Sequence, residues 1–180
     1  MFGFHSRKTR LGLDILSSEI RLAVIEGKGN EASVTALGTA ALPDGILSES
    51  YSTLNITDPD GFARALSDLV RRTAPCKAAR TAVSLPDPLF RLQVFEFDEL
   101  PGRAADRERL IRWRFEKSGA FDIADTVLRY QLIPREGKGV LLLACFAKRD
   151  VVKQYEDLIA GAGLEPWHIG PASLSLLSFY

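Results

Sequence analysis

Apolar and polar residues alternate through the segment at residues 11–27, LGLDILSSEIRLAVIEG, with a polar break in its middle. The apolar positions on the two sides of the break are Leu11, Leu13, Ile15, Ile20, Leu22 and Val24. A period of two is typical of a strand that buries one of its faces. The segment therefore predicts a β-hairpin whose turn contains Ser17 and Ser18.

Similar patterns predict the other elements. Strands are expected at residues 33–42, 80–85, 89–97, 126–133, 139–147 and 164–169. Helices are expected after Asp58, at residues 104–118 and 149–162, and from Pro171 to the end of the chain. Asp58 followed by Pro59 is a typical helix start, because the carboxylate caps free N–H groups and proline suits the first turn.

The order of these elements predicts an α/β fold. Three strands come first and helices alternate with strands after them, which favours a sheet with mixed strand directions. Residues 86–147 form a β-α-β-β unit that can be removed to leave a continuous outer pattern, as expected of an inserted subdomain. The expected organisation is thus a flexible tail at 1–10, a core at 11–85 and 148–180, and an inserted subdomain at 86–147.

The composition suits a globular protein. The 180 residues are 46% hydrophobic and 26% charged, and 23 basic residues balance 23 acidic ones. This balance argues against a nucleic-acid binder, which normally carries a basic excess. No apolar run reaches the roughly 18 residues that a membrane-spanning helix needs. The start, MFGFHSRKTR, lacks the apolar region of a signal peptide; we interpret it as a flexible tail, with weak contact to a membrane surface or partner as the alternative.

Side chains that often carry chemistry are few and scattered. Cys76 and Cys145 lie far apart in the sequence, so neither a disulfide framework nor a metal site is predicted, and a reducing compartment is the default. His5 and His168 are isolated, so we expect no catalytic triad and no metal cluster. The sequence therefore gives no candidate for a catalytic or a metal-binding residue.

The predicted hairpin turn is the place where polar groups gather. Asp14 precedes Ser17 and Ser18, so a carboxylate, two hydroxyls and several backbone N–H groups are expected at one spot. Such a spot can hold a phosphate and its magnesium ion. It can equally be a hairpin with a polar tip, and the residues alone leave both interpretations open.

Four longer segments follow one another in a recognisable order. They are SRKTRLGLDILSSEIRLAVIEG, ALPDGILSES, TAVSLPDPLFRLQVFEFDELP and VLLLACFAKRDVVKQYEDLIAGAGLEPWHIGPASLSL. Together they resemble the PilM family of actin-like pilus assembly proteins, whose opening is a short basic tail and a G-x-D-x-G-S-S-x-x-K pattern. FtsA and the cytoplasmic part of GspL look like more distant relatives. The resemblance implies a ribonuclease H-like lobe of the actin type, with a mixed sheet and an inserted β-α-β-β subdomain.

The resemblance also implies a function. PilM proteins are cytoplasmic and work at the inner membrane, as scaffolds or adaptors in the assembly platform of a type IV pilus or a related secretion machine. They take the short cytoplasmic tail of a membrane-anchored partner into a groove, so their association with the membrane runs through that partner. On this resemblance Leu100, Trp113 and Phe121 are candidate groove residues, and core packing is the alternative for these side chains.

Against the family pattern, the phosphate turn at Asp14, Ser17, Ser18 and Arg21 looks degenerate. Leu16 stands where the family has its second glycine, and Arg21 stands where it has a lysine. A leucine there would cost about 1–2 kcal/mol in a left-handed turn. The chain also ends about where the first lobe of the superfamily ends, and no second Asp-x-Gly hairpin follows residue 27.

We therefore expect no cofactor in this chain, and ATP with magnesium only in a longer protein. The favoured function is partner binding and assembly. The alternative is a nucleotide-binding actin-like ATPase whose second lobe is absent here, in which Asp14 orients metal-bound water and Arg21 neutralises charge. A structural α/β domain without a ligand is a third interpretation, and the sequence leaves enzymatic activity open.

Overall fold

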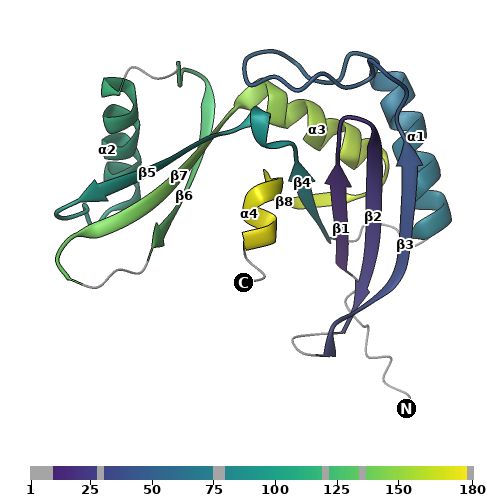
Figure 1. Ribbon diagram of the computed structural model, residues 1–180, viewed down its shortest axis with the longest axis horizontal. Coiled ribbons are helices and arrows are strands. Elements are labelled where there is room, and N and C mark those ends of the chain that lie inside the picture. The colour runs from purple at the N-terminus through teal and green to yellow at the C-terminus, as the bar shows by residue number, and fades with distance from the viewer. Residues whose placement is uncertain (1–9, 28–30, 75–79, 119–121, 134–136, 178–180) are drawn as a thin grey trace.

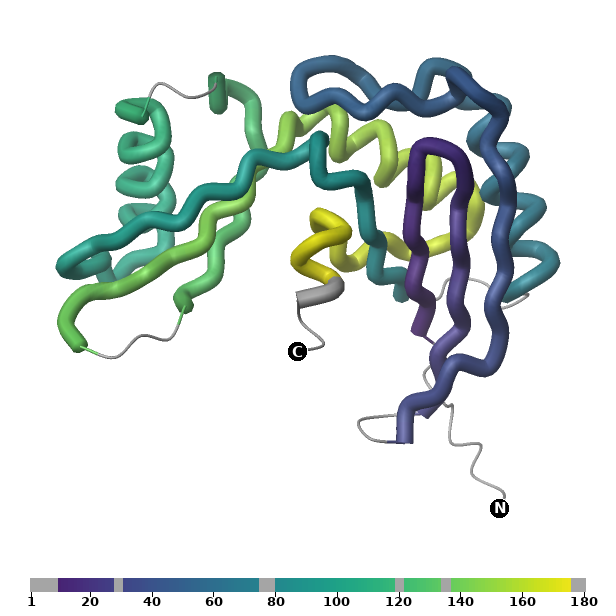
Figure 2. The backbone as a smooth tube through the Cα atoms, in the orientation of Figure 1, coloured from purple at the N-terminus to yellow at the C-terminus, as the bar shows by residue number. Residues whose placement is uncertain are grey.

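The computed structural model describes residues 10–27, 31–74, 80–118, 122–133 and 137–177. Their strands form two separate sheets, and each sheet packs on helices through a hydrophobic core of its own (Figure 1). The chain trace runs from the larger sheet out to the smaller one and back again (Figure 2).

The larger sheet has five strands in the order β3-β2-β1-β4-β8. Their bounds are Arg10–Ile15 for β1, Glu19–Glu26 for β2, Ser33–Ala41 for β3, Arg80–Leu85 for β4 and Glu165–Pro171 for β8. Strands β1, β2 and β3 pair antiparallel, whereas β4 lies parallel to both β1 and β8. The predicted opening hairpin and the mixed strand directions are therefore confirmed.

Helices α1 (Pro59–Thr73) and α3 (Arg149–Gly161) lie together against one face of the five-stranded sheet (Figure 1). The alternating apolar residues of the sheet point at these helices and are buried there: Leu11, Leu13, Ile15, Ile20, Leu22, Val83 and Leu85. Phe62 of α1 meets Tyr155 of α3 edge to face, with ring centroids 6.5 Å apart. The predicted start of α1 is confirmed, because the Asp58 carboxylate accepts a 2.9 Å hydrogen bond from the Gly61 N–H.

The smaller sheet has three antiparallel strands in the order β5-β7-β6. Their bounds are Arg91–Phe97 for β5, Thr126–Ile133 for β6 and Val140–Lys148 for β7, and α2 (Ala104–Lys117) covers one face (Figure 1). Phe115 of α2 packs there against Phe95 and Phe146, with ring centroids 6.3 Å and 4.4 Å away. These aromatic contacts form the centre of the second core.

The chain passes between the two sheets at two places. It leaves β4 through residues 86–90, which include the short 3₁₀ turn Asp87–Leu89, and it returns from β7 directly into α3. The strand predicted from residue 89 begins only at Arg91, because Pro88 lies in that turn and has no N–H for a ladder. Helix α4 (Ala172–Leu177) follows β8 and lies against β4 and β8.

The remaining predicted elements lie close to their expected bounds. Arg10, which the sequence assigned to a flexible tail, is instead the first residue of β1 and pairs with Ile25 and Arg80. The rest of that tail and Cys76 lie outside the described residues. Within the part of the chain that the structure describes, no helix combines the length and the apolar character needed to cross a membrane.

Substitutions at Tyr155 test the packing of the first core. Its side chain is fully buried, and its hydroxyl has no hydrogen-bond partner among the described residues. Burial accordingly raises the pKa of this phenol. Because the hydroxyl loses water without gaining a bond, we expect Tyr155→Phe to keep the free energy of unfolding within about 1 kcal/mol or to raise it.

Tyr155→Ala should lower that free energy by about 3–5 kcal/mol, because the ring fills the space between α1 and α3. Urea unfolding of both variants measures the two effects. A large loss of stability in the Tyr155→Phe variant would show that the hydroxyl makes a stabilising hydrogen bond, contrary to the structure.

Candidate functional site

The turn between β1 and β2 brings two of the predicted phosphate residues together. Asp14 and Arg21 are direct cross-strand partners, and Asp14 Oδ2 lies 3.9 Å from Arg21 Nη1. Arg21 is also bonded to Glu19, whose Oε1 accepts from Nε at 2.8 Å and from Nη2. The guanidinium of Arg21 therefore already faces two carboxylates.

The backbone of the turn is also engaged. The Leu16 N–H donates to the Glu19 carbonyl over 2.9 Å, and the Leu42 N–H donates to the Ser18 carbonyl over 2.8 Å. Ser17 and Ser18 are exposed, and Leu16 is half-buried. Among the described residues Asp125 is the only non-glycine with a positive φ, so the strain expected for a left-handed Leu16 does not arise.

This arrangement is a poor fit for a tightly bound phosphate. Phosphate turns offer several free N–H groups and an uncompensated positive charge. Here the Leu16 N–H closes the hairpin and the Arg21 charge is balanced by Glu19 and Asp14. Across the described ranges, no group of three His, Cys, Asp or Glu side chains lies close enough to hold a metal ion. The Leu16 N–H and the Arg21 guanidinium are therefore already engaged within the hairpin.

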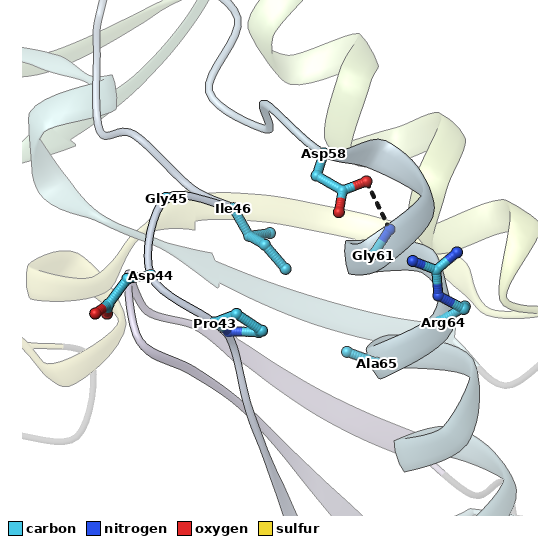
Figure 3. Close-up of a pocket in the computed structure, with 8 residues that line it drawn as sticks. All are labelled: Pro43, Asp44, Gly45, Ile46, Asp58, Gly61, Arg64 and Ala65. Carbon is cyan, nitrogen blue, oxygen red and sulfur yellow. Dashed lines mark hydrogen bonds between the residues drawn. The ribbon is translucent and has the colours of Figure 1, made fainter.

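Figure 3 shows a surface pocket at the N-terminal end of α1. It is lined by Pro43, Asp44, Gly45, Ile46, Asp58, Gly61, Arg64 and Ala65. The Asp58 carboxylate caps the helix by accepting from Gly61, so a negative charge already occupies the positive end of the helix dipole. An anion would gain little from binding at this position, and we assign the pocket no ligand.

Two of the three candidate groove residues, Leu100 and Trp113, lie in the described part of the chain. Leu100 is half-buried and packs against the second core. Trp113 lies on the outer side of α2, 47% exposed, with the Lys117 ammonium 4.3 Å from the centre of its ring. Phe121 lies outside the described residues. Of the two described candidates, Trp113 therefore has the more exposed side chain.

The face of the smaller sheet opposite α2 carries a group of apolar side chains that the sequence analysis missed, with Glu96, Arg129 and Gln131 beside them in register. We call it the open face and define it by Leu92, Val94, Leu141, Leu143 and Cys145. Leu92 and Val94 are 39% and 49% exposed, and the other three side chains are half-buried. In register, Leu92 pairs with Cys145 and Val94 pairs with Leu143, so the five residues adjoin one another.

A signal for the open face is present in the sequence. Residues 139–147, GVLLLACFA, are apolar on both faces of the strand, although one helix can cover only one of them. The thiol on this face is not a nucleophile, because burial raises the pKa of Cys145 to about 12 and keeps it protonated. The open face is therefore mainly aliphatic at Leu92, Val94, Leu141 and Leu143, and its thiol is not activated.

No protein-family model matches the sequence, and a search of the curated proteins gives no match. Solved structures do match. The chain is similar to a chain of the PilM–PilN type IV pilus biogenesis complex, with 24% identity, a TM-score of 0.77, and coverage of 94% of this chain and 49% of that one.

The cytoplasmic domain of EpsL, an inner-membrane component of the type II secretion system of Vibrio cholerae, matches with 14% identity and a TM-score of 0.57. That alignment covers 91% of this chain and 57% of the EpsL chain, so the protein spans only about half the length of either structure. The resemblance to PilM and GspL suggested by the sequence is confirmed at the level of the fold: the chain has a mixed α/β fold similar to the actin-like fold of PilM and EpsL.

Proposed function

We propose that the protein is a cytoplasmic actin-like scaffold or adaptor in the inner-membrane assembly platform of a type IV pilus or a related secretion machine. In this role it binds the cytoplasmic tail of a membrane-anchored, PilN-like partner, associates with the membrane through that partner and binds no nucleic acid. The observation that carries the proposal is the structural likeness to a chain of the PilM–PilN complex over 94% of the present chain. The likeness to the cytoplasmic domain of EpsL supports the same setting.

The proposal includes a division of the chain. The first lobe, which is ribonuclease H-like and of the actin type, consists of residues 11–85 and 148–180. The subdomain inserted into it consists of residues 86–147. Two observations support this division. The smaller sheet has its own aromatic core, and the chain enters and leaves it at neighbouring points, between β4 and β5 and between β7 and α3.

The open face is the surface that we assign to the partner's tail. An extended peptide binds by placing alternate apolar side chains on a surface of this kind while its backbone stays extended. Leu92 and Val94 offer exposed apolar area, and the half-buried Leu141 and Leu143 extend it. The outer side of α2 around Trp113 is the competing surface, but there the Lys117 ammonium lies over the ring.

Val94→Asp tests the open face. The probe is a fluorescein-labelled peptide with the cytoplasmic tail sequence of the PilN-like protein from the same cells, and binding is followed by fluorescence anisotropy. We expect the unmodified chain to bind, and Val94→Asp to weaken binding by about tenfold or more, because a charge would be buried against apolar peptide side chains.

Leu37→Asp is the matched control, since Leu37 is 72% exposed on β3 of the other sheet and the substitution adds the same charge. It should leave the affinity unchanged. A loss of binding in Trp113→Ala with normal binding in Val94→Asp would move the site to the outer side of α2. Absence of binding by the unmodified chain would contradict the proposed partner.

The phosphate turn leads to a separate prediction about nucleotide. Because the Leu16 N–H and the Arg21 guanidinium are already engaged, we expect millimolar ATP with magnesium to leave the melting temperature of this chain unchanged. Thermal shift measurements with and without Mg–ATP check this. A rise in melting temperature that disappears in Asp14→Ala would instead favour the nucleotide-binding ATPase.

A further inference from the structure

The segment between β3 and α1 has a defined structure and is held on α3. The side chain of Asn55 is fully buried, and its Nδ2 donates to the carbonyls of Ser50 and Thr53 over 2.8 Å and 2.7 Å. From α3, Gln154 Oε1 accepts from the N–H groups of Asn55 and Ile56 at 2.9 Å and 3.0 Å, and its Nε2 donates to the Ile56 carbonyl at 2.9 Å. The segment is therefore a firm part of the larger body.

Tyr51 extends from this segment to the first chain crossing. Its side chain is only 8% exposed, and the centre of its ring lies 4.3 Å from the Arg91 guanidinium carbon. Arg91 is the first residue of β5, and its Nη1 donates to the carbonyls of Pro88 and Phe90 over 3.1 Å and 2.9 Å. The guanidinium is thus positioned where the chain enters the smaller sheet.

Tyr51 also reaches the region where the chain returns. Its hydroxyl donates to the Asp122 carbonyl, 3.3 Å away, just before β6. The Asp122 carboxylate pairs with Lys148 Nζ at 3.0 Å, and the same ammonium donates to the Ala124 carbonyl at 2.8 Å. The Ala124 N–H and the Lys148 ammonium hold the pKa of Asp122 below its ordinary value, so this ion pair is present at neutral pH.

The contacts at the two chain crossings are largely apolar. Leu89, Phe90 and Ala147 lie at the crossings and are buried in the first core, and Cys145 of β7 packs against the same core. Apolar contacts of this kind are not directional, so they tolerate small rotations. A cation–π contact and a hydrogen bond have preferred geometries. A third connection between the two bodies, made by directional contacts, therefore restricts the rotation of the smaller sheet about the two crossings.

We propose that Tyr51 is a clasp that sets the orientation of the smaller sheet relative to the five-stranded sheet. Through Arg91 it joins the segment after β3 to the start of the smaller unit, and through Asp122 it joins that segment to the stretch before β6, which pairs with Lys148 at the end of β7. Release of Tyr51 lets the smaller sheet rotate about the two crossings without unfolding. The inference concerns the geometry of the chain and does not depend on the proposed partner.

The distance between the two bodies tests this clasp. Nitroxide labels are attached at Ser67→Cys on α1 and Glu116→Cys on α2, both exposed positions, with Cys76→Ser and Cys145→Ala to remove the native thiols. Double electron–electron resonance then gives the distribution of distances between the labels. The same labelled chain carries each test substitution, and circular dichroism reports whether it is folded.

Tyr51→Ala should broaden the distribution and shift its mean, whereas Tyr51→Phe, which retains the ring on Arg91, should change it less. Leu54→Ala is the control, because Leu54 lies on the same segment and is 53% exposed. An unchanged distribution in folded Tyr51→Ala overturns the proposal. If Tyr51→Ala does not fold, Tyr51→Leu decides: it removes both the ring over Arg91 and the hydroxyl bond to Asp122 and keeps an apolar side chain, so broadening supports the clasp and an unchanged distribution overturns it.

Discussion

The burial of one face of the five-stranded sheet beneath α1 and α3 is the interaction on which the rest of this structure depends. The face is apolar in all three strands at its centre, and the contact between Phe62 and Tyr155 joins the two helices above it. At about 25 cal/mol per Å² of buried apolar surface, this layer is the main driving force for folding of the larger body. This buried layer positions the opening hairpin, the segment after β3 and the chain crossings.

The smaller sheet is stabilised separately, by an aromatic cluster beneath α2. One helix covers one face, so Leu92 and Val94 on the second face of this sheet remain exposed to solvent. An exposed apolar face lowers solubility unless something binds to it, which makes it a natural place for a partner. The placement of that face relative to the larger body depends on contacts at the crossings, to which Tyr51 adds directional contacts with Arg91 and Asp122.

In the turn after β1, the residue pattern suggests a phosphate site, whereas the contacts in the structure do not favour one. Its order of Asp14, Ser17, Ser18 and Arg21 leads to the expectation of a phosphate turn, and the hairpin itself is as expected. In the structure the charges of Asp14, Glu19 and Arg21 compensate one another, and the Leu16 N–H closes the turn. The order of these residues therefore does not by itself indicate nucleotide chemistry.

The sequence by itself determined the elements and the fold class, because hydrophobic periodicity, helix caps and turn residues are local signals: the 11–27 hairpin and the Asp58 cap are examples. Tertiary structure alone decided which apolar residues remain exposed. The strand at 139–147 is apolar on both faces, so only the docking of α2 reveals that Leu92 and Val94 face solvent while Phe95 is buried. It also decided that Tyr51, in an irregular segment, meets Arg91 and Asp122, since contacts between residues so distant in sequence leave no local pattern.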